Sequence, residues 1–219
     1  MTEPEAGVVS DGRARKFELR GGVPSLDFVN TVGSRTTDRP REYLQSYGDL
    51  LDWARQAGLL TSAEGERLSR RAMLDPEGAQ ETLSRALTLR EAIYRVVSAT
   101  IGGEPQNEND LSALNGELSV ALSHLRVVPA GSAYGWGWDR GENDGEAPLD
   151  GFLWPVARSA AELLTSPKLG RVKVCAGDGC GWAFLDESRN GSRRWCDSRD
   201  CGNRERVRRH LARKRTSGS

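Results

Sequence analysis

The four cysteines near the C-terminal end are the residues whose type and spacing most clearly define a chemistry. Cys175, Cys180, Cys196 and Cys201 form two C-x4-C pairs separated by residues 181–195, and the chain has no other cysteine. Two close pairs with a short segment between them are typical of four thiolates on one Zn²⁺. We therefore expect one zinc ion per chain, and because four thiolates close its coordination shell, we expect it to be structural.

Two disulfides, or four unrelated thiols, are the alternatives for these cysteines. The N-terminus lacks the apolar stretch of a signal peptide, and no run of about 18 apolar residues predicts a membrane span. We therefore expect a cytoplasmic protein, in whose reducing compartment paired cysteines more often bind metal. His210 is a weaker candidate ligand because the cysteines already complete the set.

The cysteines lie in the basic part of the chain. The net charge of the 219 residues is zero, but residues 171–219 contain thirteen Lys and Arg against six Asp and Glu, a balance of +7. The remaining residues therefore carry a net charge of −7, which should restrict contact with nucleic acid to the basic end.

The arginines of this basic end indicate the partner. Arginine suits phosphate and guanine, so DNA is the predicted partner, with RNA left open. The candidate nucleic-acid-binding residues are Arg193, Arg194, Arg204, Arg206, Arg208, Arg209, Arg213, Lys214 and Arg215. A solvated charged face is the alternative, although only Glu205 interrupts the run after Cys201.

The sequence gives little support for an enzyme. The histidines, His124 and His210, are far apart, and no cysteine is left over as a nucleophile. P-loop, G-x-G-x-x-G and G-x-S-x-G motifs are absent from the sequence. We expect no enzymatic activity, although acid–base chemistry by carboxylates stays open.

Start and stop signals predict a mainly helical region before the cysteines. Residues 26–32 indicate a short buried helix, and Ser46 and Thr61 each begin a capping-box pattern. Asp75 and the proline after it begin the longest helix, and Asn109 or Asp110 should cap the next one. The side chains expected to face inward from the long helix are Leu83, Ala86, Leu87, Ile93, Val97 and Ile101.

A β-hairpin and a last helix complete this region. Residues 125–128 and 134–138 predict the hairpin, with Trp136 and Trp138 more often core than the rim of a ligand pocket. Residues 139–148 form an acidic loop and 152–165 a helix. We place the domain boundary at the Ser166–Pro167 break.

The order of elements around the cysteines is that of a treble clef. A strand at 171–174 leads into the first cysteine pair, 182–184 and 193–195 form a hairpin, and a helix begins after the second pair. Val207 and Leu211 should dock that helix. Trp182, Phe184 and Trp195 form a small core beside the zinc rather than a base-stacking surface. So small a module needs metal binding to supply its folding free energy.

Asn30 and Arg90 are polar residues within apolar runs, where a buried polar group needs a partner. They are candidate effector-binding residues, and the effector is unknown. The alternative is that they satisfy backbone groups or an internal ion pair.

Several motifs resemble known families. Residues 180–190 (CGWAFLDESRN), 193–196 (RRWC) and 201–204 (CGNR) resemble the CGNR-type zinc finger. Residues 26–31 (LDFVNT), 49–53 (DLLDW) and 89–92 (LREA) are similar to the ABATE domain. The resemblance covers about 17–215 and implies a bacterial transcription regulator of the stress response.

We therefore expect a mainly α N-terminal domain with a small β-hairpin, followed by a C-terminal treble-clef-like ββα zinc finger. The predicted parts are a disordered N-terminus (1–16), an ABATE-like domain (17–166), a CGNR-type finger with four cysteine ligands (167–215) and a disordered tail (216–219). The favoured function is DNA binding for transcription regulation, with the helical domain as sensor or assembly surface, which leaves homo-oligomers open. A protein-interaction module with a structural finger, or an RNA-binding accessory protein, are the alternatives.

Overall fold

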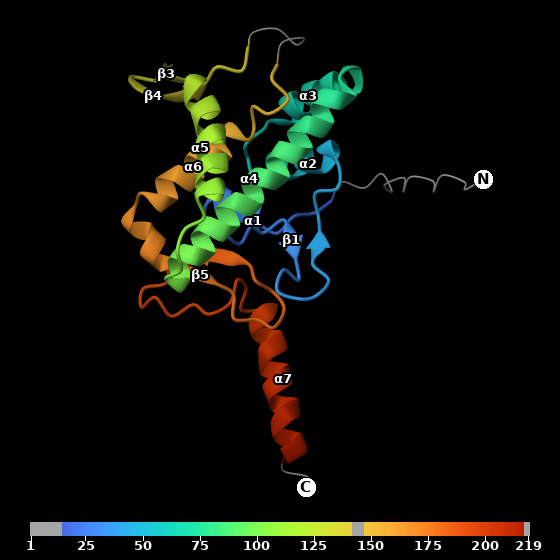
Figure 1. Cartoon of the computed structure of the whole chain (residues 1–219), viewed down its shortest axis with the longest axis vertical. Coiled ribbons are helices and arrows are strands. Elements are labelled where there is room, and N and C mark those ends of the chain that lie inside the picture. Colours follow the sequence, from blue (N-terminus) through green and yellow to red (C-terminus); the bar gives the residue numbers. More distant parts are fainter. Residues whose placement is uncertain (1–14, 142–146, 217–219) are drawn as a thin grey trace, which may run out of the picture.

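The computed structural model describes residues 15–141 and 147–216, and Figure 1 shows their arrangement. The disorder expected for residues 1–16 and 216–219 falls outside this range except at residues 15, 16 and 216, and part of the acidic loop also falls outside it. A helical body occupies one end of the molecule, and a single helix projects from the other (Figure 1). No helix within the described residues is long and apolar enough to cross a membrane.

Within these described ranges six α-helices build the body, which confirms the mainly helical expectation. They are α1 (Pro24–Val29), α2 (Tyr47–Gln56), α3 (Ser62–Leu74), α4 (Pro76–Gly102), α5 (Glu108–Ser123) and α6 (Trp154–Leu164). The long helix α4 packs against each of the other five. Side-chain caps are present at the starts of α2, α3, α4 and α5.

The predicted helix starts are confirmed at three of four positions. Ser46 and Thr61 form complete capping boxes, and the Asp75 side chain accepts from the Gly78 amide ahead of Pro76. The start of α5 was wrongly predicted: Asn107 is its cap, and its side chain accepts from the Asn109 amide. Asp110 lies in the first turn, where Arg95 binds it at 2.6 Å.

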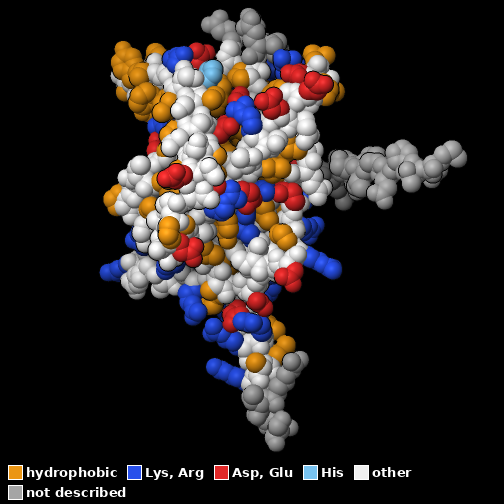
Figure 2. Space-filling view, viewed as in Figure 1, with side chains coloured by type: hydrophobic (Ala, Val, Ile, Leu, Met, Phe, Trp, Pro, Cys, Tyr) orange, Lys and Arg blue, Asp and Glu red, His pale blue; other side chains and the backbone are white. Residues whose placement is uncertain are grey.

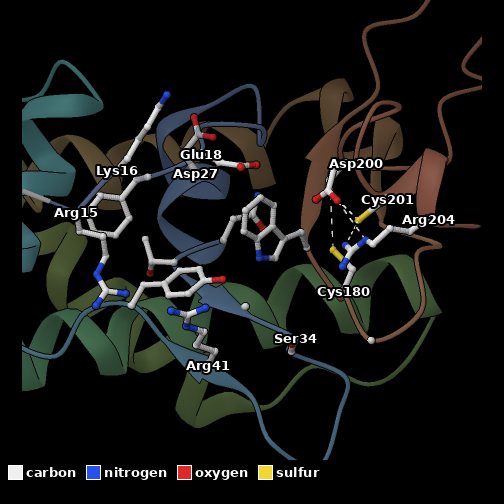
Figure 3. A pocket seen from close by; sticks show the side chains of 18 of the residues that line it. Arg15, Lys16, Glu18, Asp27, Ser34, Arg41, Cys180, Asp200, Cys201 and Arg204 are labelled. Atoms are coloured by element: carbon white, nitrogen blue, oxygen red, sulfur yellow. Dashed lines mark hydrogen bonds and ion pairs between the residues drawn. The ribbon is translucent and has the colours of Figure 1, made fainter.

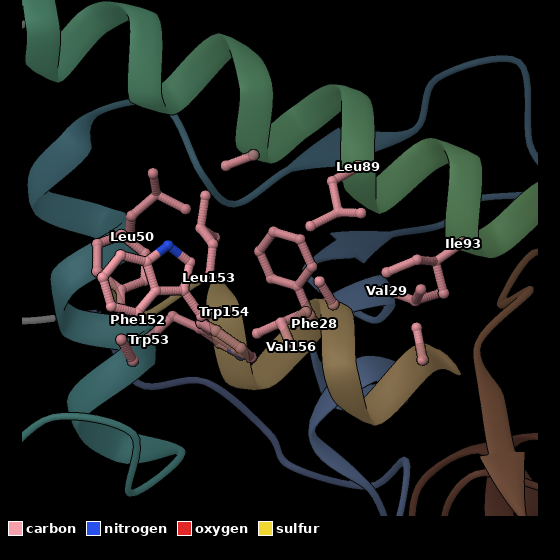
Figure 4. Packing of buried hydrophobic residues seen from close by; sticks show 14 of the residues in the cluster. Phe28, Val29, Leu50, Trp53, Leu89, Ile93, Phe152, Leu153, Trp154 and Val156 are labelled. Carbon is pink, nitrogen blue, oxygen red and sulfur yellow. The ribbon is translucent and has the colours of Figure 1, made fainter. Parts of the chain in front are cut away.

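Aromatic side chains fill the centre of the body, as Figure 4 shows. Phe28 and Trp53 pack with ring centroids 4.8 Å apart, and both are fully buried. Of the side chains predicted to face inward from α4, Ile101 is instead 40% exposed because it lies in the last turn of the helix.

Two small sheets belong to the body. β1 (Val32–Gly33) pairs with β2 (Arg41–Glu42), and the predicted hairpin forms from β3 (Leu125–Ala130) and β4 (Ala133–Trp138). Trp138 packs on Trp154 at 6.0 Å, whereas Trp136 is 62% exposed. Of the two hairpin tryptophans, only Trp138 therefore packs against the core, and it is itself half-buried.

The C-terminal part contains a short 3-10 helix η1 (Pro167–Arg171), β5 (Val172–Val174), β6 (Ala183–Leu185) and α7 (Cys201–Thr216). The predicted hairpin between 182–184 and 193–195 is wrong, because β6 pairs with β5. Side chains bind the backbone groups of Arg193 in the later segment, and the Arg194 carbonyl accepts from the Ala176 amide. The Arg193 amide donates to Asp186, and its carbonyl accepts from Lys173. A hairpin followed by a helix, with four clustered cysteines, is nevertheless the expected order.

The β5–β6 hairpin packs on the helical body. Val172, Ala183 and Leu185 belong to the same buried cluster as the aromatic core. Asn30, at the end of α1, bonds both backbone groups of Ala183, at 2.8 and 2.9 Å. The boundary at Ser166–Pro167 coincides with the start of η1 and stays a prediction.

Candidate metal centre and basic helix

The four cysteine sulfurs gather in one buried cluster. All four Sγ atoms lie within 4.8 Å of one another. Cys196 Sγ lies 3.7 Å from that of Cys180 and 3.6 Å from that of Cys201. Tetrahedral coordination with Zn–S bonds of about 2.3 Å places sulfurs about 3.8 Å apart. The residues therefore fit one zinc ion, and none of the four is in a disulfide.

Hydrogen-bond donors surround these sulfurs. The Cys175 sulfur accepts from the amides of Cys196 and Gly177, and the Arg204 guanidinium lies 2.9 Å from the Cys201 sulfur. A hydrogen bond with Cys175, another with Cys180, and burial all raise the pKa of Cys196 above its ordinary value. Four thiolates in this space need a bound cation, which is the chemistry that Zn²⁺ supplies.

Glycines let the backbone approach the sulfurs, a feature that our sequence reasoning missed. A Cβ on Gly177 would lie 3.0 Å from the Cys201 Cβ and 3.1 Å from its sulfur. Gly181 has φ of +69°, a left-handed conformation that glycine adopts readily. The glycines that lie near the cysteines in the sequence could have indicated this close approach.

The first cysteine pair is attached to the β1–β2 loop. The amide of Arg35 donates to the Cys180 carbonyl at 3.2 Å, and the Trp182 indole donates to the Val32 carbonyl at 2.7 Å. Phe184 is fully buried beside the cysteines, with Trp182 and Trp195 packed around it. These aromatic residues form the expected small core.

Helix α7 leaves the zinc centre and projects away from the body (Figures 1 and 2). Val207 and Leu211 are 50% and 52% exposed. The prediction that they dock the helix is wrong, because α7 extends beyond the residues that could cover them. The anchor is instead its first turn, where Cys201 and Gly202 are buried.

The candidate nucleic-acid-binding residues occupy different environments. Arg193 is half-buried, and its guanidinium bonds main-chain carbonyls, among them those of Trp195 and Leu185. Arg194 is exposed and lies over the Trp195 ring, 5.6 Å from its centroid. Arg204 contacts the Cys201 sulfur.

The remaining candidate nucleic-acid-binding residues lie along α7. Arg208 and Arg209 each pair with Glu205 at 2.9 Å, and Arg206 bonds the Asn203 side chain. Exposed positions on the helix are Arg204, Arg206, Arg208, Arg209, Arg213 and Lys214, and the Arg215 side chain lies outside the described residues. His210 is also exposed and is not part of the sulfur cluster.

The two candidate effector residues do not lie together in one site. The Asn30 amide bonds Ala183, as described above. Arg90 is buried and forms a double hydrogen bond with Glu42 at 2.7 and 2.6 Å. Both side chains therefore have partners within the chain, and the effector role stays a prediction.

A helical body joined to a four-cysteine module that ends in a basic helix defines a zinc-finger protein. Residues 22–167 match the family model ABATE, described as "Putative stress-induced transcription regulator", and residues 171–214 match the CGNR zinc finger. The chain belongs to the ABATE family and carries a CGNR zinc finger with one zinc site. No curated protein matches the chain.

Proposed function

We propose that this chain is a DNA-binding transcription regulator of the bacterial cytoplasm, without enzymatic activity. In this proposal α7 contacts the duplex, and the helical body is the sensor or assembly surface. The observation that carries it is the position of α7, which begins at Cys201 in the zinc centre and is exposed at every described position after Glu205. The family description supports the regulatory role.

The dimensions and charge of α7 suit a DNA groove. Its 16 residues make a rod about 24 Å long, and the major groove admits one helix. The phosphate contacts that we propose come from Arg206, Arg208, Arg209, Arg213 and Lys214, with Arg194 beside them. Arg193 and Arg204 would instead stabilise the finger, because their donors point to main-chain carbonyls and to a ligand sulfur.

Salt dependence of binding tests the proposal. Zinc-loaded protein should bind a random duplex pool with an affinity that falls steeply as salt rises, because each neutralised phosphate releases counterions. The double variant Arg208→Ala, Arg209→Ala should reduce the slope of log affinity against log salt by about two if both touch phosphate. The matched control is Arg39→Ala, Arg70→Ala, which removes two exposed arginines from the body and should leave the slope unchanged.

The alternatives give different results in the same assay. Preference for structured RNA over duplex DNA would favour an RNA-binding accessory protein. Absence of salt-sensitive binding to either would contradict the proposal. The half-exposed Val207 and Leu211 would then favour α7 as a protein-docking helix.

A further inference from the structure

A cavity of about 370 Å³ lies between the helical body and the zinc finger (Figure 3). The segment 15–18, α1 and the β1–β2 hairpin form its walls on the body side. Cys180, Cys201 and Arg204 line it on the finger side. Asp178 and Asp200 also line this side, and both pair with arginines of α7. A cavity of this size is within the range of small-molecule sites.

One side of the cavity carries two arginines with few acidic partners. Arg15 and Arg41 flank Tyr43, with guanidinium carbons 5.7 and 5.6 Å from the ring centroid. Lys16 also lines the cavity, but its side chain points away from both arginines (Figure 3). Within the described residues Arg41 has no ion pair. Arg15 has only a 3.7 Å contact with Asp49. Like charges held together favour an anion between them.

The adjoining wall carries carboxyl groups. Asp27 and Glu18 line the cavity, and Glu18 has a 3.6 Å contact with Arg20. Asp27 accepts the Gly21 amide at 2.7 Å, but no Lys or Arg of the described residues pairs with it. Burial raises the pKa of Asp27 to about 6, against the effect of the backbone hydrogen bonds. A ligand amine would supply the missing positive charge.

The backbone at this cavity is also strained. Ser34, on the rim, has φ of +50° and is the one non-glycine residue with positive φ in the described parts of the chain. Such conformations cluster at ligand sites.

We propose that the cavity binds a small organic zwitterion of the amino-acid type. Its acidic group pairs with Arg15 and Arg41, and its amine pairs with Asp27 and Glu18. A simple anion would leave the two carboxyl groups facing it, and a simple cation would face the two guanidinium groups.

The ligand would lie against the start of α7. Arg204 lines the cavity and contacts both the Cys201 sulfur at 2.9 Å and Asp200 at 3.2 Å. Occupation of the cavity therefore changes the surroundings of the residue that joins zinc centre and helix. Control of DNA binding by the ligand rests on the function proposed above, whereas ligand binding itself does not.

Calorimetric titration of zinc-loaded, full-length protein with each standard amino acid tests the site without DNA. We expect at least one of them to bind. Its N-acetyl form, which lacks the amine charge, and its amide form, which lacks the carboxylate, should each bind at least tenfold more weakly. Failure of every amino acid to bind, or equal binding of a blocked form, would overturn the proposal.

Variants locate the site. Arg41→Ala should weaken binding tenfold or more, while Arg39→Ala, which changes an exposed arginine two residues earlier that does not line the cavity, should leave it unchanged. Glu18→Gln, at an exposed position where folding is not at risk, and Asp27→Asn should weaken binding of the free amino acid but not of its N-acetyl form. Equal affinities for parent and Arg41→Ala would place the ligand elsewhere.

Discussion

Arginines with the same charge have different surroundings in this chain, and these surroundings are the basis for dividing them by role. The donors of Arg193 bond the carbonyls of Arg20 and Leu185, among others, and its guanidinium lies 4.2 Å from the Phe184 ring centroid. Arg208 instead lies on an exposed helix face beside Glu205. Composition showed a basic end but could not separate these residues, because what distinguishes Arg193 is a contact with a segment distant in sequence.

Asp27 provides a residue-scale test by titration. Its folded pKa of about 6 lies above its ordinary value of 3.8, so ionisation disfavours the folded state, and stability is lost as pH rises through this interval. Asp27→Asn cannot ionise and still offers an oxygen to the Gly21 amide. We expect it to be more stable than the parent by up to about 3 kcal/mol at pH 8, with a smaller advantage at pH 5.

Urea unfolding of zinc-loaded protein without ligand at both pH values measures this difference. Asp38→Asn, which removes an exposed carboxylate from the β1–β2 loop, is the control. If the stability difference between Asp27→Asn and the parent is the same at pH 5 and pH 8, the pKa of Asp27 is not raised in the folded state.

At the scale of elements, structure set by residues close in sequence could be predicted, whereas pairing between distant segments could not. Capping boxes at Ser46 and Thr61 predicted two helix starts, because a cap is a contact between residues three apart. The strand that pairs with β6 could not be predicted in this way, since the backbone groups of Arg193, in the segment predicted to pair with it, are bound by the side chains of Asp186 and Lys173. The sulfur cluster was predictable because four cysteines with paired spacing have few alternatives.

Helix α7 gives the element-scale prediction. Because Val207 and Leu211 are half exposed, the double variant Val207→Ser, Leu211→Ser should change the free energy of unfolding by less than about 0.5 kcal/mol. Zinc content should stay at one ion per chain. Phe184→Ala, at a fully buried position beside the cysteines, is the contrasting control and should cost about 3–5 kcal/mol. A loss of about 2 kcal/mol or more in the double variant would mean that α7 docks in solution.

At the scale of the whole molecule, the two family matches meet at a packed junction. The ABATE match ends at residue 167 and the zinc-finger match begins at 171, the two ends of η1. Across this junction β6 packs on α1, and the amide of Leu185 donates to the Gly21 carbonyl at 2.8 Å. We propose that the halves are two domains in sequence whose stabilities are coupled.

Asn30 is the residue through which this coupling can be tested. Its amide bonds both backbone groups of buried Ala183, in the strand between the helical body and the cysteines. Asn30→Ala leaves those groups without partners and should destabilise the protein by about 2–4 kcal/mol. It should also speed zinc release to a chelator, because zinc binding and folding of the finger are linked. Asn107→Ala removes the α5 cap instead, and should destabilise the protein by about 1 kcal/mol without changing the rate of zinc release.

Removal of zinc by a chelator should lower the melting temperature of the helical body in the parent. The decrease should be smaller in Asn30→Ala, where the hydrogen bonds between the two domains are already lost. If chelation leaves the helical transition of the parent unchanged, the two domains fold independently and the coupling is refuted.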